Sequence, residues 1–191
     1  MKTIEAIKKR QSVRKFSSKK PGWRDIVEAI HSARHAPMAG GIFSLKFLIV
    51  DDKETIEKIA KWSEQNFIAD AKYVVVFVSD EEKVKNLYKE LGKTFVPQQA
   101  GAAIENFLLH LTDAKLSSCW VGYFNENKIK TLLKIPDDKT IEALFPIGYA
   151  DKSVKPKKEK APPYDVMYFN EWGNKRMRKI EKIESRGPEG Y

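Results

Sequence analysis

The chain has 191 residues, of which 42% are hydrophobic and 32% charged. This length suits one domain, or one domain with an appended tail, around a single sizeable core. Nowhere does an apolar run approach the roughly 18 residues of a membrane span, and the first residues lack the apolar stretch of a signal peptide. The sequence therefore predicts a cytoplasmic protein without a membrane segment.

Basic residues outnumber acidic ones: 35 Lys and Arg against 26 Asp and Glu give a formal net charge of +9 at pH 7. This excess favours anionic partners such as phosphorylated cofactors, nucleotides or nucleic acid. Much of it lies in 152–160 and 175–182. The one cysteine, Cys119, excludes an internal disulfide and a cysteine metal cluster, and its place in an apolar run predicts a buried, inert thiol.

Apolar spacing and breaker residues predict alternating helices and strands along the first three quarters of the chain. In chain order we first expect a helix over 4–8, a helix over 23–36 ended by Pro37, a glycine loop at 39–41 and a strand over 45–50. A helix capped by Asp52 and reaching about 65, a strand over 73–78, and a helix capped by Asp80 and ended by Gly92 follow. The last expected elements are a helix over 98–114 opened by Pro97, a strand over 117–123, a helix capped by Asn125 and reaching 133, and a strand over 140–149.

The expected helix over 98–114 has almost no polar side, with apolar residues around most of its circumference between Ala102 and Leu109. A helix of this kind must be surrounded, and a chain of this size offers few neighbours to surround it. We therefore expect a partner subunit to supply the second wall.

After Ala150 the character of the sequence changes. The stretch 151–163 is rich in Lys and Pro without periodicity, which predicts an extended arm over the surface. Trp172 resembles a docking aromatic, and the charged residues up to Tyr191 suggest a short helix and a loose end. The sequence thus divides into a domain over 1–150 and a basic arm and tail over 151–191 that is not an independent domain.

The run from Arg10 to Phe16 brings two guanidiniums and the Ser12 hydroxyl together after the first helix. Arg presents a planar fork of donors that matches phosphate, and a hydroxyl adds a short hydrogen bond. The run therefore suits an anion site. Taken alone, a basic run of this length is more often a solvated face.

Standard catalytic motifs are missing from the sequence. There is no phosphate-binding glycine loop ending in Lys-Ser or Lys-Thr, no dinucleotide fingerprint and no Gly-x-Ser-x-Gly elbow, so nucleotide hydrolysis and esterase chemistry lose support. His31 and His35 have the spacing of zinc ligands, but Arg34 lies between them and no acidic partner accompanies them. We expect these imidazoles to lie beside the glycine loop, where one contacts a ligand.

A chain without an evident acid, base or nucleophile can still be an enzyme if a cofactor performs the chemistry. Here the ordered motifs resemble the FMN-dependent nitroreductase family. The likeness spans about 3–172 and rests on four stretches in order: Arg10-Gln11-Ser12-Val13-Arg14-Lys15-Phe16, Ala36-Pro37-Met38-Ala39-Gly40-Gly41, the helix from 99 to 116 followed by Ser117-Ser118-Cys119-Trp120-Val121-Gly122, and Lys158-x-Lys160-x-Pro162.

The resemblance implies an α+β fold of the nitroreductase type. Its central mixed or antiparallel sheet is flanked by helices in an intertwined homodimer, with two FMN molecules at the interface. Residues 1–150 would form the flavin-binding α+β domain, and the arm over 151–191 would reach across the partner to complete the dimer.

By the same resemblance, Arg10, Lys158 and Lys160 hold the FMN phosphate, while Ser12 and Arg14 hold the ribityl chain and the pyrimidine edge. A dianionic phosphate needs cations from more than one direction, and a positive group near the pyrimidine favours the anionic reduced flavin.

The remaining implied contacts come from three further stretches. Val121 and Gly122 bring a backbone N–H close to flavin N5, where the missing side chain of glycine permits close approach. Gln65 matches a polar position that faces the flavin. The loop residues reach the flavin of the partner; they are Pro37, Met38, Ala39 and Gly40.

The glycine loop departs from the common family pattern, because Gly41, Phe43 and Leu45 stand where many members have Asn, Gln and Trp. The loop is closer to that of the branch that dehydrogenates azoline rings in modified peptides. The electron acceptor is therefore open.

The resemblance predicts an oxidoreductase in which NADH or NADPH reduces FMN, and a small acceptor such as a nitroaromatic, quinone or enone then takes the electrons in a ping-pong mechanism. Three alternatives remain open. The protein could be a flavin-dependent dehydrogenase of another substrate, a flavin carrier or redox sensor, or a basic nucleic-acid-binding protein, which is suggested by aromatics among the cations at Tyr164, Tyr168, Phe169 and Trp172.

Overall fold

The computed structural model describes residues 1–155 and 166–176, so Lys158 and Lys160 lie outside the described residues. The chain separates into two compact units, Met1–Pro156 and Lys157–Tyr191. The boundary predicted after Ala150 stays a prediction. None of the helices in the described ranges is both long and apolar enough to cross a membrane.

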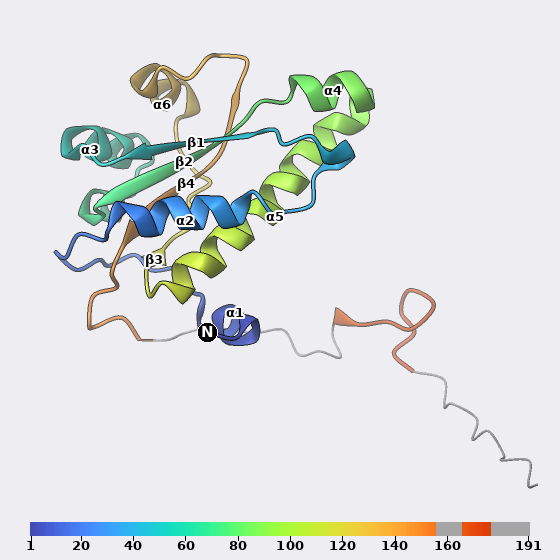
Figure 1. The fold of residues 1–191 in the computed structure, drawn as a ribbon, viewed down its shortest axis with the longest axis horizontal. Coiled ribbons are helices and arrows are strands. Elements are labelled where there is room, and N and C mark those ends of the chain that lie inside the picture. Colours follow the sequence, from blue (N-terminus) through green and yellow to red (C-terminus); the bar gives the residue numbers. More distant parts are fainter. Residues whose placement is uncertain (156–165, 177–191) are drawn as a thin grey trace, which may run out of the picture. The chain divides into compact units, whose positions relative to one another are not determined.

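The first unit is built on an antiparallel sheet of four strands in the order β1-β2-β4-β3 (Figure 1). The strands are β1 (Leu45–Val50), β2 (Tyr73–Ser79), β3 (Ser117–Ser118) and β4 (Thr140–Gly148). Strand β2 is buried along its whole length because it pairs with a neighbour on each edge and carries helices over both faces. Its β-branched and aromatic side chains point alternately to the two faces.

One face of the sheet is covered by α2 (Trp23–Ala33) and α5 (Gly92–Asp113), which pack on the aromatic core around Phe77, Phe107 and Phe145. The three rings meet edge to face, with centroids 4.9–5.5 Å apart. The other face is covered by α3 (Lys53–Trp62), the short turn of helix η2 (Asn66–Asp70) and α6 (Glu126–Leu133). This helix–sheet–helix arrangement is an α+β fold (Figure 1).

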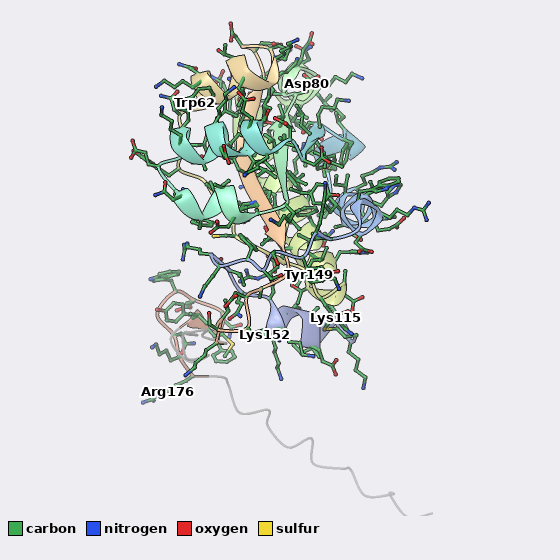
Figure 2. The ribbon with its side chains drawn as sticks, turned by 90° about the vertical axis from the view of Figure 1, so that its left-hand side faces the viewer. Trp62, Asp80, Lys115, Tyr149, Lys152 and Arg176 are labelled. Atoms are coloured by element: carbon green, nitrogen blue, oxygen red, sulfur yellow. The ribbon has the colours of Figure 1, made fainter. Side chains whose placement is uncertain are left out.

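Four shorter elements complete the unit. They are α1 (Thr3–Lys9), η1 (Ala39–Gly41), α4 (Glu82–Tyr88) and η3 (Lys89–Leu91). In the side view, Trp62 and Asp80 mark one end of the sheet, and Tyr149 and Lys115 lie toward the opposite end (Figure 2).

Two of the three expected helix caps are confirmed. The carboxylate of Asp52 accepts the Thr55 N–H at 2.8 Å, and Asn125 Oδ1 accepts the Lys128 N–H at 3.1 Å. Asp80 lies one residue before the N-cap position of α4, which Glu81 occupies. Its carboxylate accepts a hydrogen bond from Lys139 Nζ at 2.8 Å and also a backbone hydrogen bond from Glu82, the first residue of α4.

The predicted break at Gly92 is also wrong, because α5 begins at Gly92 and contains Pro97. Gly92 lies against α4, where an added Cβ would come within 2.9 Å of the Lys85 Cα. The residue thus permits close contact between the two helices instead of ending one. Pro97 removes one hydrogen bond to the carbonyl of Lys93 near the helix start, and the helix continues.

The strand predicted over 117–123 is much shorter than expected. Only Ser117–Ser118 pair with β4 as a strand, after which Cys119 and Trp120 leave the ladder. Val121 then returns, exchanging two backbone hydrogen bonds of 3.0 Å with Leu144. Helix boundaries also differ, with α2 ending at Ala33 and α3 at Trp62.

Within the second unit the structure describes only 166–176. Phe169 and Asn174 close this segment through two hydrogen bonds of 2.8 Å, one of them from the Asn174 side-chain amide. The rings of Tyr168 and Trp172 have centroids 4.9 Å apart, and the Trp172 side chain is 91% exposed.

Glu142 on β4 gives the fold a pH dependence. Burial raises the pKa of its carboxyl, the hydrogen bond from Ser79 Oγ at 2.5 Å acts in the opposite direction, and the neighbouring Glu81 and Glu126 raise the pKa further. The native state therefore favours the protonated Glu142 carboxyl. The contribution of this group to the free energy of unfolding is fully present below the pKa that it has in the unfolded chain, and it is lost as the pH rises through its higher pKa in the native state.

We expect Glu142→Gln to raise the free energy of unfolding at pH 7, because it removes the cost of a buried charge while keeping an oxygen for Ser79. The gain should disappear below about pH 4, near the ordinary Glu pKa. Urea titrations at both pH values measure it, with Glu28→Gln on the exposed face of α2 as the control. A variant less stable than the parent at pH 7 contradicts this account.

Candidate functional site

The run from Arg10 to Phe16 lies along the edge of the sheet formed by β3 and the end of β4. The Val13 N–H donates to the Ser118 carbonyl at 2.9 Å, and Ser12 pairs with Ser118 in parallel. Further along, the Ser17 N–H donates to Tyr149 O at 2.8 Å. The segment is therefore extended and held by its backbone.

Two apolar side chains fix which face of the segment is buried. Val13 and Phe16 pack with Ala71, and both are less than 10% exposed. Phe16 lies over Gly148, where an added Cβ would come within 3.0 Å of the ring. With these two side chains inside, Ser12 and Arg14 are left exposed at the edge.

The two guanidiniums of the motif have different surroundings. Arg10 ends α1 and places Nε 3.7 Å from the Glu105 carboxylate on α5, with a quarter of its side chain exposed. Arg14 lies over the Phe67 ring, with its Cζ 5.8 Å from the ring centroid. Neither guanidinium is buried against a bidentate carboxylate, so both keep donors for an anion.

Cys119 lies beside this exposed face and is itself buried, as the sequence predicts. Burial raises the pKa of its thiol, while the positive charge of Arg14 and hydrogen bonding with Ser12 and Arg14 act in the opposite direction. These electrostatic contacts show that Ser12 and Arg14 both reach the stretch that follows β3.

Val121 and Gly122 lie on that same stretch. Val121 is 2% exposed and is fixed by its pairing with Leu144. A Cβ added at Gly122 would meet only the Trp120 indole nitrogen, at 4.0 Å, so the backbone there faces open space. Gln65 joins this group, because its amide donates to the Tyr123 carbonyl at 3.1 Å. Six of the predicted site residues thus lie along one edge: Arg10, Ser12, Arg14, Gln65, Val121 and Gly122.

The predicted loop residues lie elsewhere on the same chain. The Ala39 N–H donates to Gln99 Oε1 at 3.0 Å, and Gly40 adopts a φ of 58° that suits glycine. Pro37, Met38 and Ala39 line a cavity of about 350 Å³ against the Phe95–Ala102 part of α5. The motif contacts α5 further along, at Glu105, so one chain does not bring the loop and the motif together. Lys158 and Lys160 lie outside the described residues.

Several neighbours of the site were not predicted. Glu105, Phe67 and Tyr123 contact Arg10, Arg14 and Gln65 respectively. Trp120 and Tyr123 leave two aromatic side chains 44% and 68% exposed on either side of Gly122. The Trp-x-Gly spacing was a usable signal for Trp120. Glu105 gave no signal, because charged residues on exposed helix faces are common.

Two of the histidines, His35 and His110, line a cavity of about 340 Å³ between α1, α2 and α5 that contains, among the described residues, none of the predicted site residues. Ser32 Oγ is 2.7 Å from His110 Nδ1. In the part of the chain that the structure describes, no three His, Cys, Asp or Glu side chains are grouped as metal ligands.

The fold and the edge define an α+β protein with two arginines and an open backbone at Gly122 beside its last strands. Residues 7–67 and 60–149 match the model of the nitroreductase family. This match covers well over half of the sequence, and the chain belongs to the nitroreductase family.

Relatives and solved structures agree with this family. A Streptococcus pyogenes protein, provisionally named an NAD(P)H nitroreductase, is 27% identical over 187 residues, covering 82% of this chain and 94% of the relative. The crystal structure of a nitroreductase family protein from Clostridium novyi NT has a TM-score of 0.74 at 29% identity, covering 91% and 96% of the two chains. The NADPH:FMN oxidoreductase from Vibrio harveyi, solved with NAD+, has a TM-score of 0.77 at 20% identity over 89% and 77%, a likeness of fold.

We predict that the Cys119 thiol reacts slowly with a disulfide reagent in the native protein at pH 8. Burial both blocks access and raises the thiol pKa, so labelling should be at least about tenfold slower than in urea. The chain has no other cysteine, so absorbance of the released thiolate reports this site alone. Equal rates in buffer and urea would show that the edge between the motif and β3 is open.

Proposed function

We propose that this protein is an FMN-dependent oxidoreductase that takes electrons from NADH or NADPH and passes them to a small acceptor. The observation that carries the proposal is the gathering of Arg10, Ser12, Arg14 and Gln65 beside the open backbone of Gly122. Membership of the nitroreductase family supports it.

The donor set of the edge fits the phosphate and ribityl parts of FMN. Arg10 has Nε near Glu105, which leaves its two terminal nitrogens for a phosphate. The Ser12 hydroxyl is exposed two residues on, toward the ribityl chain. Lys158 and Lys160 are the further cations that we propose for the phosphate, since one guanidinium offsets only part of a dianion.

The ring part of the cofactor also finds suitable partners. A flavin is a large planar group that needs apolar and aromatic contacts on its faces and polar contacts at its edge. Phe67, Trp120 and Tyr123 provide exposed or half-exposed aromatic surface along this edge. Arg14 and Gln65 provide polar groups for the pyrimidine end.

When bound, FMN supplies two-electron transfer between the nicotinamide cofactor and the acceptor. The chain's own residues then bind and orient it. Arg14 places positive charge where negative charge gathers on the pyrimidine. The backbone of Val121 and Gly122 leaves room for the reacting edge of the ring system, because no side chain projects there.

We infer that the active form is a homodimer in which the loop over Pro37–Gly40 completes the partner's site. Within one chain this loop is kept apart from the motif by α5. The outward face of α5 also leaves three small or apolar residues incompletely buried, namely Gly101, Ala102 and Leu109. A second copy would cover this face and bring each loop to the other motif.

The acceptor is a small molecule, for which we propose a nitroaromatic, quinone or enone. The loop offers no polar side chain at Gly41 or Phe43, and the Phe43 ring lies 6.1 Å from that of Phe47. An apolar loop surface of this kind favours the binding of aromatic or conjugated acceptors over highly charged ones. A dehydrogenase of another substrate and a flavin carrier are the alternatives, and turnover distinguishes them.

Adding FMN to the apoprotein should quench flavin fluorescence with a 1:1 endpoint, and NADH or NADPH should then bleach the bound flavin under nitrogen. Addition of a quinone or nitroaromatic should then restore the yellow colour of the oxidised flavin. A protein that leaves FMN fluorescence unchanged is not a flavoprotein. One that binds FMN but is bleached by neither nucleotide is a carrier.

The motif is tested by Arg10→Ala, which should weaken FMN binding by about tenfold to one hundredfold, because it removes charged hydrogen bonds to phosphate. Arg24→Ala, an exposed arginine on α2, is the matched control and should change the dissociation constant by less than about twofold. Fluorescence titration measures both. Equal effects of the two substitutions would refute the role of Arg10.

The dimer is tested by sedimentation of the 21.9 kDa chain, which should run at twice this mass. Leu109→Glu should shift the equilibrium toward monomer, since it places a charge in the proposed apolar interface. Ile49→Glu on β1, at a position that is 41% exposed, is the control and should stay dimeric. A monomeric parent protein that retains full turnover would rule out a site shared between copies.

A further inference from the structure

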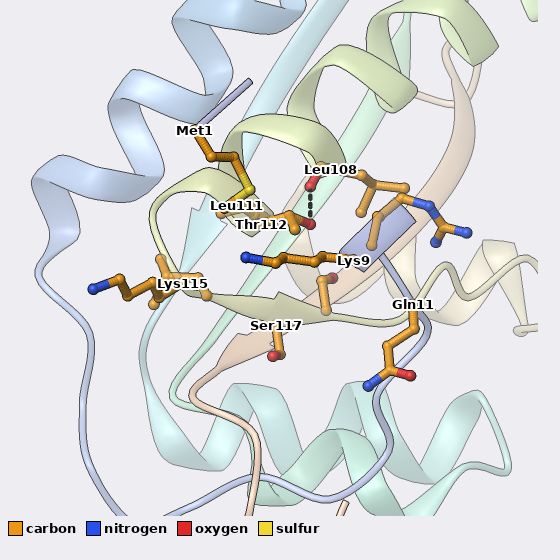
Figure 3. A pocket seen from close by; sticks show the side chains of 11 residues that line it. Met1, Lys9, Gln11, Leu108, Leu111, Thr112, Lys115 and Ser117 are labelled. Atoms are coloured by element: carbon orange, nitrogen blue, oxygen red, sulfur yellow. Dashed lines mark hydrogen bonds between the residues drawn. The ribbon is translucent and has the colours of Figure 1, made fainter. Parts of the chain in front are cut away.

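A third cavity, of about 260 Å³, lies between the end of α1, the last turns of α5 and β3 (Figure 3). Its apolar wall includes Leu108 and Leu111 of α5. Lys9 extends across the middle of the cavity between Thr112 and Ser117, while Lys115 lies at its rim. The volume is far larger than a few waters need and slightly below that of a typical drug-sized site.

Positive charge dominates the lining of this cavity. Lys9, Arg10 and Lys115 all contribute to it, and no carboxylate does among the described residues. In the same described ranges, Lys9 and Lys115 form no ion pair, while Arg10 has only the contact of 3.7 Å to Glu105. The negative end of α5 carries about half an elementary charge, which offsets only part of three positive charges.

A buried hydroxyl without a partner lies in the same lining. Ser118 is 5% exposed, and among the described residues its Oγ has no hydrogen-bond partner. Most buried side-chain hydroxyls find a partner, because an unpaired one loses its hydrogen bonds to water without replacing them. An anion in the cavity would satisfy this donor and the two lysines together.

The cavity borders the proposed flavin site but has a different lining. Among the described residues, its lining contains none of Ser12, Arg14, Gln65 or Gly122. Arg10, at the end of α1, is the one proposed flavin-binding residue in that lining.

We propose that this cavity binds a small organic anion. Its carboxylate or other oxyanion group accepts hydrogen bonds from Lys9 Nζ and the Ser118 hydroxyl, with Lys115 turning in from the rim on its flexible stem. Its compact apolar body lies against Leu108 and Leu111. The site does not depend on FMN.

Calorimetric titration of the full-length protein with benzoate tests the proposal, with benzamide as the uncharged ligand of the same shape. We expect one benzoate per chain and at least about tenfold weaker binding of benzamide, because the amide lacks the charge that Lys9 and Ser118 recognise. The dissociation constant for benzoate should differ by less than about threefold between FMN-loaded protein and apoprotein, since Arg10 is the one charged group shared by the two proposed sites. Mutual exclusion of benzoate and FMN would overturn a separate site.

Matched substitutions locate the binding. Ser118→Ala should weaken benzoate binding about tenfold, because one hydrogen bond to a charged group is lost. Ser63→Ala is the matched control and should have no effect, since Ser63 Oγ is likewise buried and without a partner among the described residues. Lys9→Gln should weaken it about threefold, against no change for the exposed Lys83→Gln on α4. Undiminished binding in both Ser118→Ala and Lys9→Gln overturns the proposal. Benzoate binding that follows this pattern in a protein that never retains FMN would uphold the anion site while the proposed oxidoreductase fails.

Discussion

Backbone pairing between the stretch from Ser12 to Ser17 and the edge of β3 and β4 is the constraint on which the site depends. It holds a segment that follows a short helix against the sheet through two isolated bridges, Ser12 with Ser118 and Phe16 with Ala150. Val13 and Phe16 are both buried although they lie three residues apart, so their packing and not a strict alternation decides which side chains are left outside. Phe16 over Gly148 fixes the position of the segment, because a shift of one residue would expose this ring and bury a charged neighbour.

Helix α5 has two roles that bear on the site that we propose to be shared between two chains. Its inner face packs on the ring cluster of Phe77, Phe107 and Phe145, so its position is fixed by the core. Its other surfaces contact the glycine loop near Gln99 and the motif near Glu105. A rigid helix therefore sets a constant separation between the two groups. In the homodimer that we propose, a second copy would close that separation without disturbing the core.

The sequence predicts those features that depend on local chemistry. The buried run of β2, the Asp52 and Asn125 caps and the motif residues are visible because each has a period or a neighbour close in sequence. Gly92 was mistaken for a helix stop, since its role depends on the Lys85 backbone of another helix. The partner of Asp80 across the fold, Lys139, was not predicted because it is distant in sequence. The early end of β3 and the ion pair of Arg10 with Glu105 likewise depend on tertiary contacts, and no local sequence pattern indicates them.

The cations beside the Arg10–Phe16 edge differ in what surrounds them. Arg14 has an aromatic neighbour, Phe67, and an open backbone nearby at Gly122, which suits a planar ring with a charged edge. Lys9 has aliphatic neighbours and a buried hydroxyl, which suits a compact anion. Net charge alone does not distinguish these environments. Since the same backbone hydrogen bonds hold both, a substitution that loosens Val13 or Phe16 should disturb both kinds of binding together, whereas one at Ser118 or Arg14 should disturb one of them.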